Sequence, residues 1–317
     1  MNSPYKIFKV VVVSLICLVV NSAISKDNQT LLIVLSSESD YYREAAEEFS
    51  RTLAANKLPL TIRQTLVDHA AKALAEKPDM VLAVGSKAAF DLAQHRPEAE
   101  VINILLPRSA HQTLANEATD KKRLTGIYLD QPERRLVNLS LLLPLEIRRV
   151  GCVASSEDMA VSARVLKEQF ISKQVEFNFE QMNDKQKPIQ VLRPLFSDID
   201  LFIALPDNTI FTRAIARWIL NFSLQQNIPV LGFSAAYAEA GALLSIYSTP
   251  QQIGRQAAEI VISNMNNGAL PPSSGIAPRY FEIKVNQAVV RKMGINPARM
   301  KSSLLHSQLQ DMEASGE

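Results

Sequence analysis

The strongest constraint on the fold is an alternation of short apolar runs with segments of helical periodicity. Residues 31–35 (LLIVL) form a continuous apolar run that predicts a buried strand, and apolar residues recur at helical spacing over 41–56. Two further strands are expected at 79–85 and 101–106, with a helix beginning at Ser86 between them. Continuous apolar strands that alternate with helices predict a parallel sheet covered by helices on both faces.

The alternation starts again after Pro144. Strands are expected at 149–154, 198–206 and 228–234, and the longest intervening helix is expected over 209–226. Two successive series of about 100 residues predict an α/β protein with two doubly wound parallel-sheet lobes. A single (β/α)₈ barrel of about 250 residues is the topological alternative.

The amino terminus has the pattern of a secretory signal. Lys6 and Lys9 precede an apolar stretch over 10–20, and small residues follow at Ala23 and Ser25. This order predicts export, with cleavage after Ser25. A retained membrane anchor is the alternative, although the stretch is shorter than the roughly 20 residues that span a bilayer.

Charge and cysteine content narrow the possible partners. The chain holds 34 Lys and Arg residues against 32 Asp and Glu residues, and two of the basic residues, Lys6 and Lys9, leave with the signal. The remaining charge is balanced, which gives no electrostatic reason to expect nucleic acid. Cys152 is then the single remaining cysteine, so no internal disulfide can form.

The usual motifs of catalysis and metal binding are missing from the sequence. It contains no phosphate-binding loop, no dinucleotide-binding glycine motif and no complete nucleophile elbow. The four histidines are scattered without metal-ligand spacing, and each is expected on the surface or in a loop. We therefore predict no enzymatic activity, no catalytic residue, no metal site and no cofactor.

Polar residues and one glycine instead gather where predicted strands end. They are Ser36, Ser37, Gly85, Ser86, Ser155, Ser156, Asp207, Asn208 and Ser234. The carboxyl ends of parallel strands border the ligand crevice in doubly wound sheets, and helices beginning there suit a carboxylate. Asp207 could pair with an ammonium group, so the set suits a zwitterion such as an amino acid. The alternative is that these residues are helix N-caps, and one residue can serve both purposes.

Several short motifs resemble one protein family. They are Ile228-Pro229-Val230, Gly241-Ala242-Leu243, Ile253-Gly254-Arg255-Gln256-Ala257-Ala258, Gly85-Ser86-Lys87-Ala88-Ala89, Thr125-Gly126 and Leu205-Pro206-Asp207-Asn208. The chain resembles the exported substrate-binding proteins of ABC transporters, in the family that includes tryptophan- and tyrosine-binding members. The likeness spans nearly the whole chain after the signal and is strongest over 200–261.

The resemblance implies a type I periplasmic binding protein fold with two lobes and a three-crossing hinge. The expected parts are a signal peptide at 1–25, lobe 1 at 28–145 with 248–270, and lobe 2 at 146–247 with 275–300. The crossings are expected near Pro144, Ser248 and Pro271–Ser274. Residues 301–317 are polar with little to bury, so we expect a mobile tail.

The resemblance also implies a function. We expect a soluble, monomeric periplasmic receptor that binds a small ligand between its lobes and delivers it to an ABC permease and ATPase. By position Ser86, Asp207 and Asn208 would contact the ligand, with Ser36, Ser37 and Ser155 as further candidates. The alternative is an accessory module that reports its ligand to a membrane receptor kinase without transport.

Two positions depart from the family pattern. The family has an Asp-Pro pair after the fourth strand, where this chain has Leu106-Pro107-Arg108. The Asn that precedes Thr-Gly in the family is also absent, because Arg123-Leu124 stands before Thr125-Gly126. Arg108 could offer a cation to an anionic ligand, or it could lie in a solvated loop.

Overall fold

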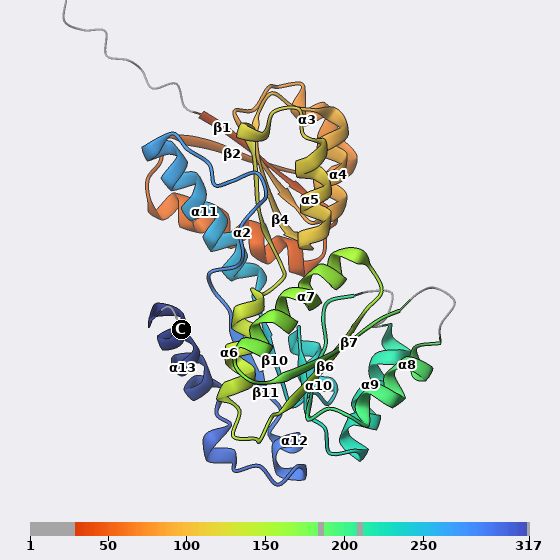
Figure 1. The fold of residues 1–317 in the computed structure, drawn as a ribbon. Helices are drawn as coiled ribbons and strands as arrows, with labels where there is room; N and C mark the ends of the chain where they lie inside the picture. Colours follow the sequence, from red (N-terminus) through yellow and green to blue (C-terminus); the bar gives the residue numbers. More distant parts are fainter. Residues whose placement is uncertain (1–28, 183–186, 208–211, 316–317) are drawn as a thin grey trace, which may run out of the picture.

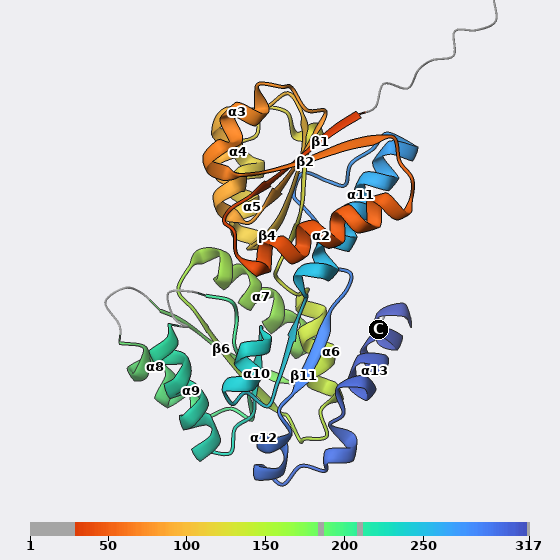
Figure 2. The same ribbon diagram turned by 180° about the vertical axis from the view of Figure 1, so that it is seen from behind.

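The computed structural model describes residues 29–182, 187–207 and 212–315, and it has two α/β lobes (Figures 1 and 2). The predicted signal peptide and Asn208 lie outside the described residues. Within the described ranges, no helix has the length and apolar character needed to cross a membrane. The chain forms two separate sheets, which confirms the two-lobe prediction and excludes the single barrel.

Lobe 1 is built on a five-stranded sheet in which every neighbouring pair is parallel. In spatial order the strands are β2 (Leu60–Leu66), β1 (Gln29–Leu35), β3 (Met80–Val84), β4 (Glu100–Leu106) and β5 (Leu124–Tyr128). Alternate residues of β1 belong to different clusters, with Ile33 packing toward one face and Val34 toward the other. This period of two places apolar side chains on both faces and explains the continuous apolar runs.

Helices cover both faces of this sheet (Figure 1). One face carries α2 (Asp40–Ala55) and α11 (Pro250–Asn267), and the other carries α3 (Ala70–Leu74), α4 (Ser86–His95) and α5 (Arg108–Glu117). The two helices α2 and α11 come into close contact at Gly254. A Cβ atom there would overlap the backbone carbonyl oxygen of Ala45, so only glycine fits without a shift.

Lobe 2 is built on a six-stranded sheet with one antiparallel edge strand. In spatial order the strands are β11 (Glu282–Val285), β10 (Leu244–Tyr247), β9 (Val230–Gly232), β8 (Leu201–Ile203), β6 (Arg149–Ala154) and β7 (Glu176–Gln181). One face packs on α6 (Glu133–Leu142), α7 (Glu157–Ser172), α12 (Gln287–Lys292) and α13 (Ser302–Ser315). The other face packs on α8 (Pro188–Phe196), α9 (Arg213–Gln225) and α10 (Ala235–Ala240).

Three crossings join the lobes, and two of them differ in position from the sequence prediction. Residues of α6, such as Val137 and Leu139, lie in the core of lobe 2, so the first crossing precedes α6 instead of falling at Pro144. Ile276 still forms a bridge with Ile127 of β5, so the third crossing follows residue 276. Helical periodicity identifies an apolar face but does not tell which sheet that face covers.

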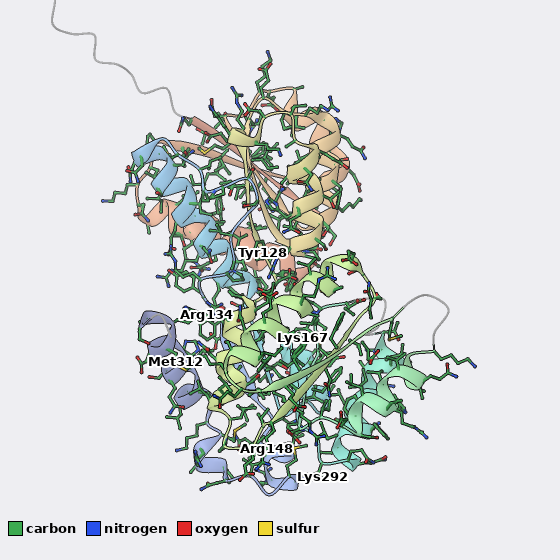
Figure 3. The ribbon with its side chains drawn as sticks, viewed as in Figure 1. Tyr128, Arg134, Arg148, Lys167, Lys292 and Met312 are labelled. Atoms are coloured by element: carbon green, nitrogen blue, oxygen red, sulfur yellow. The ribbon has the colours of Figure 1, made fainter. Side chains whose placement is uncertain are left out.

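The prediction of a mobile carboxyl-terminal tail is wrong for residues 302–315, which form α13. Leu305 and Leu309 of this helix are fully buried in the core of lobe 2. Figure 3 shows Met312 of α13 beside Arg134 of α6, and the two helices are in contact. The two leucines are four residues apart, so a mostly polar sequence still presents a narrow apolar face.

Candidate functional site

In lobe 1 the predicted site residues lie where β1 and β3 end. Ser36 is buried, and its Oγ accepts a hydrogen bond of 2.9 Å from the backbone N–H of Ala88 in the first turn of α4. Gly85 has φ +91°, and a Cβ there would come within 2.6 Å of Ser36 Oγ. The turn therefore holds Ser36 tightly against α4. Ser37 is exposed and Ser86 is partly exposed.

In lobe 2 two of the predicted residues, Asp207 and Ser155, are hydrogen-bonded to each other, and Asp207 is buried. Its carboxylate accepts a 2.7 Å hydrogen bond from the backbone N–H of Ser155 and a 2.9 Å bond from the Ser155 hydroxyl. Ser156 accepts from the first turn of α7, and Ser234 accepts from the first turn of α10. The N-cap interpretation therefore holds for Ser156 and Ser234, while ligand contact by all of these residues stays a prediction.

A narrow pocket of about 40 Å³ lies where the two lobes meet. Lobe 1 contributes Arg108, the first crossing contributes Asp130, and lobe 2 contributes Met159, Pro206 and Phe233. Of the eight predicted residues that the structure describes, none lines it, although Pro206 and Phe233 directly precede Asp207 and Ser234. The pocket therefore borders the carboxyl ends of β8 and β9, where Asp207 and Ser234 also lie, and ligand contact by the predicted residues stays a prediction.

Arg108 is the central polar group of this pocket. Its guanidinium forms a 2.8 Å ion pair with Glu133, the first residue of α6, and lies 5.0 Å from the ring centre of Tyr128. Its backbone N–H donates to the carboxylate of Asp130 at 2.7 Å. The Arg108 side chain is 21% exposed, so the solvated-loop interpretation is wrong. Figure 3 shows Tyr128 at the junction of the lobes.

One guanidinium nitrogen of Arg108 has no role within the described parts of the chain. The Nε atom is buried and has no hydrogen-bond partner there. Leaving a buried donor unpaired costs free energy, so this nitrogen favours an acceptor that enters the pocket. The sequence indicated Arg108 as a possible cation for an anionic ligand, whereas no sequence signal pointed to Asp130 or Glu133, which also line the pocket.

Burial and pairing set the charges around the pocket. Burial raises the pKa of Asp130 above its usual range, although the backbone N–H and positive charge of Arg108 oppose the shift. Burial alone would lower the pKa of Arg108, but attraction to Glu133 raises it overall. Arg108 is therefore a permanent cation, and Glu133 is its partner across the interlobe junction.

The three crossings are hydrogen-bonded to one another beside the pocket, which Gln131 also lines. Gln131 of the first crossing donates to the hydroxyl of Ser248 in the second at 2.9 Å. Ser248 Oγ donates to the carbonyl oxygen of Tyr280 in the third at 2.6 Å. We call these three residues, with Arg135, the hinge network.

Arg135 of α6 closes this network. It donates to Gln131 Oε1 at 2.7 Å and to the carbonyl oxygen of Pro278 at 3.0 Å. It also forms two hydrogen bonds with the carboxylate of Glu313 in α13, at 2.6 and 3.2 Å. Its guanidinium lies 4.3 Å from the ring centre of Phe281. The hinge is thus braced by a helix near the carboxyl terminus.

The described residues contain no cluster of His, Cys, Asp and Glu suited to a metal ion. The expectation that each histidine lies on the surface or in a loop is wrong for His111, which is fully buried within α5. Its ring fits between Gly126 and Gly275, where a Cβ would come within 2.6 and 2.7 Å of the imidazole. Such burial depends on glycines far away in the sequence.

Known structures share this two-lobed fold. A ligand-free, open substrate-binding protein with adhesive properties from Clostridium difficile gives a TM-score of 0.66 at 15% identity, covering 84% of this chain and 95% of that one. An ABC domain from Streptococcus pneumonia in complex with L-Trp gives a TM-score of 0.57 at 16% identity, and the match covers 87% of this chain and 98% of that one. A periplasmic ribose ABC transporter structure from Conexibacter woesei gives 0.54 at 14% identity, covering 87% and 97%.

The fold is therefore that of the type I periplasmic binding proteins, as the motifs implied. A search of curated proteins found no significant match. The family model described as "ABC transporter substrate binding protein" matches residues 32–303, which is most of the chain. This chain belongs to the ABC transporter substrate-binding protein family.

Proposed function

We propose that the protein is an exported receptor that captures a small, amino-acid-like ligand between its lobes and delivers it to an ABC importer in the membrane. The signal at 1–25 would place it in the periplasm. The observation that carries the proposal is the buried Arg108 Nε atom without a partner among the described residues, at a pocket that both lobes line. We expect binding without turnover.

The chemistry of the pocket suits a zwitterion. Arg108 can receive a ligand carboxylate in charge-assisted hydrogen bonds, and Glu133 and Asp130 offer carboxylates to an ammonium group. A ligand that carries both charges could enter the Arg108–Glu133 pair and give each side chain a new partner. A neutral sugar would separate the same ion pair without replacing its charges.

Ligand entry requires movement of the lobes. A volume of about 40 Å³ holds roughly one water molecule, so an amino acid needs a wider gap. Opening and closing about the hinge network would provide that gap, and the ligand must bind the closed form better by a few kcal/mol. We propose that Ser86 and Asp207 contact the remainder of the ligand in the closed form.

Calorimetric titration with the twenty L-amino acids and with D-ribose tests the proposal. We expect saturable binding of at least one amino acid and none of ribose. Arg108→Gln keeps a hydrogen-bond donor but loses the charge, so it should weaken binding at least tenfold. Arg51→Gln is the matched control, because Arg51 is exposed and paired only within α2.

Two outcomes would count against the proposal. Binding that Arg108→Gln leaves unchanged would remove this pocket as the site. Binding of ribose in place of every amino acid would keep the receptor but refute the amino-acid-like ligand.

A further inference from the structure

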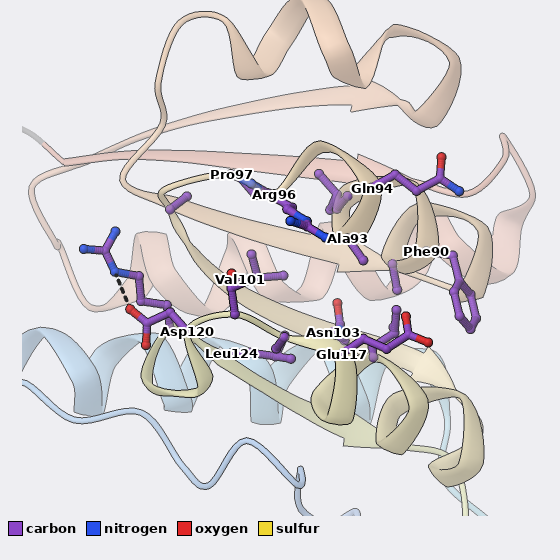
Figure 4. A pocket seen from close by; sticks show the side chains of 17 residues that line it. Phe90, Ala93, Gln94, Arg96, Pro97, Val101, Asn103, Glu117, Asp120 and Leu124 are labelled. Atoms are coloured by element: carbon purple, nitrogen blue, oxygen red, sulfur yellow. Dashed lines mark ion pairs between the residues drawn. The ribbon is translucent and has the colours of Figure 1, made fainter.

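Lobe 1 contains a second and larger cavity, of about 450 Å³, between α4 and α5. Figure 4 shows Phe90 and Ala93 of α4 on one side, Glu117 of α5 on the other, and Val101 and Asn103 of β4 between them. The cavity reaches the amino-terminal ends of β4 and β5, whereas the interlobe pocket borders their carboxyl ends. The two share no lining residue.

The walls of this cavity combine apolar side chains with charged ones, which are Arg96, Glu117, Asp120 and Arg123. Leu92 of α4, Leu114 of α5 and Leu124 of β5 line it together with Val101. Cavities of roughly 300–1,000 Å³ with apolar walls and a few placed polar groups are typical of small-molecule sites. A volume of about 450 Å³ is therefore large enough for a compact ring compound.

Asn103 supplies the one buried polar group within this cavity that the described residues leave unsatisfied. It is 1% exposed, and its Oδ1 atom has no hydrogen-bond partner in the described ranges. Its amide nitrogen lies 3.4 Å from Nδ1 of His111. A buried acceptor without a partner is costly, so this oxygen favours a donor from outside the fold.

His111 fixes which way the amide of Asn103 points. Its Nε2 lies 2.9 Å from the carbonyl oxygen of Ser273, which can only accept, so Nε2 carries the proton. Burial lowers the pKa of His111 below its usual range, despite this hydrogen bond, and favours the neutral ring. Nδ1 is then an acceptor, so the NH₂ group of Asn103 must face it. The amide oxygen is left as the free acceptor.

We propose that this cavity is a second ligand site, which takes a small apolar ring compound bearing a single N–H or O–H donor. The ring would fill the space between Leu92, Leu114 and Val101, and the donor would reach Asn103 Oδ1. The site shares no lining residue with the interlobe pocket, so this proposal does not depend on the proposed transport ligand.

Indole and benzofuran are suitable probes, because they have nearly the same shape and only indole carries a donor. In calorimetric titration of the wild-type protein we expect saturable binding of indole, with benzofuran roughly tenfold weaker. Equal affinities would show that no donor is recognised. No binding of indole at millimolar concentration would overturn the proposal outright.

Two variants locate the binding. Val101→Phe fills the cavity and should abolish indole binding, whereas Thr61→Phe, on the exposed edge strand of the same sheet, should leave it intact. Asn103→Leu should lower indole affinity to that of benzofuran. Indole binding that survives Val101→Phe would place the site elsewhere, including in the interlobe pocket.

Discussion

One buried arginine, Arg135, and one partly buried arginine, Arg108, flank the first crossing, and they differ in how their donors are used. Arg135 belongs to the hinge network, each of its guanidinium nitrogens has an acceptor, and its side chain is only 6% exposed. Arg108 lies on the pocket side, is 21% exposed, and keeps a buried Nε without a partner in the described chain. Satisfied donors indicate a structural role, and a spare buried donor indicates a place for a ligand.

The largest effect should come from removing α13, which braces Arg135. Truncation after Lys301 exposes the sites of Leu305 and Leu309 and deletes Glu313, so we expect the free energy of unfolding to fall by about 5 kcal/mol. Urea denaturation measures the change. Truncation after Ser315 is the control and should change little, and a loss below about 1 kcal/mol after Lys301 would refute the bracing role.

Substituting each arginine in turn compares the hinge network, which contains Arg135, with the pocket, which contains Arg108. Arg135→Met leaves Glu313, Gln131 and the Pro278 carbonyl without their donor, so unfolding should become easier by about 3 kcal/mol. Arg108→Met should lower the free energy of unfolding by only about 1 kcal/mol, because Arg108 forms a single ion pair, with Glu133. Chemical denaturation of each variant measures both changes in the free energy of unfolding. Equal losses would show that the spare donor does not distinguish the two positions.

Weakening the ion pair between Arg108 and Glu133 tests the pocket without changing the hinge network. Glu133→Gln removes the charge that holds Arg108 across the junction, a change of about 1 kcal/mol in favour of the open form. Small-angle scattering of the ligand-free protein should give a larger radius of gyration. Glu146→Gln breaks an exposed pair with Arg148 and should leave the radius unchanged. The same radius in both variants would contradict the role of the ion pair.

The smallest effect concerns the pH dependence of stability at Asp130. Its pKa is raised in the folded protein, so folding favours the protonated form, and its contribution to stability is lost as pH rises from the unfolded value toward the folded one. Asp130→Asn should flatten this part of the stability curve while retaining an acceptor for the Arg108 N–H. Denaturant unfolding between pH 3 and 7 measures how the free energy of unfolding changes with pH. If Asp130→Asn leaves that pH dependence unchanged, Asp130 is not its source.

The sheets could be predicted because each strand carries its own signal. Continuous apolar runs are needed when a parallel strand is covered on both faces, and the runs at 31–35 and 101–106 are strands within the two-faced core. The motif around Gly254 also has a local physical reason. Gly254 has no side chain, so the backbone of α2 can pack directly against it. Gln256 accepts a hydrogen bond of 2.7 Å from the backbone N–H of Arg279 and so anchors the third crossing to α11.

The pocket could not be predicted in the same way, because its contacts join distant segments. Arg108 meets Glu133 only after the first crossing folds back, and His111 is buried only because Gly126 and Gly275 leave space for its ring. Periodicity within one segment carries no information about such partners. The apolar face of α13 was missed because two leucines are a weak signal in a polar stretch.

The central claim is that the lobes close over a ligand held by Arg108. Small-angle scattering should be measured on the wild-type protein with and without a saturating concentration of whichever L-amino acid binds most tightly in calorimetry. A smaller radius of gyration with the amino acid bound, and no such decrease for Arg108→Gln at the same concentration, is the predicted result. An unchanged radius at proven saturation would contradict closure.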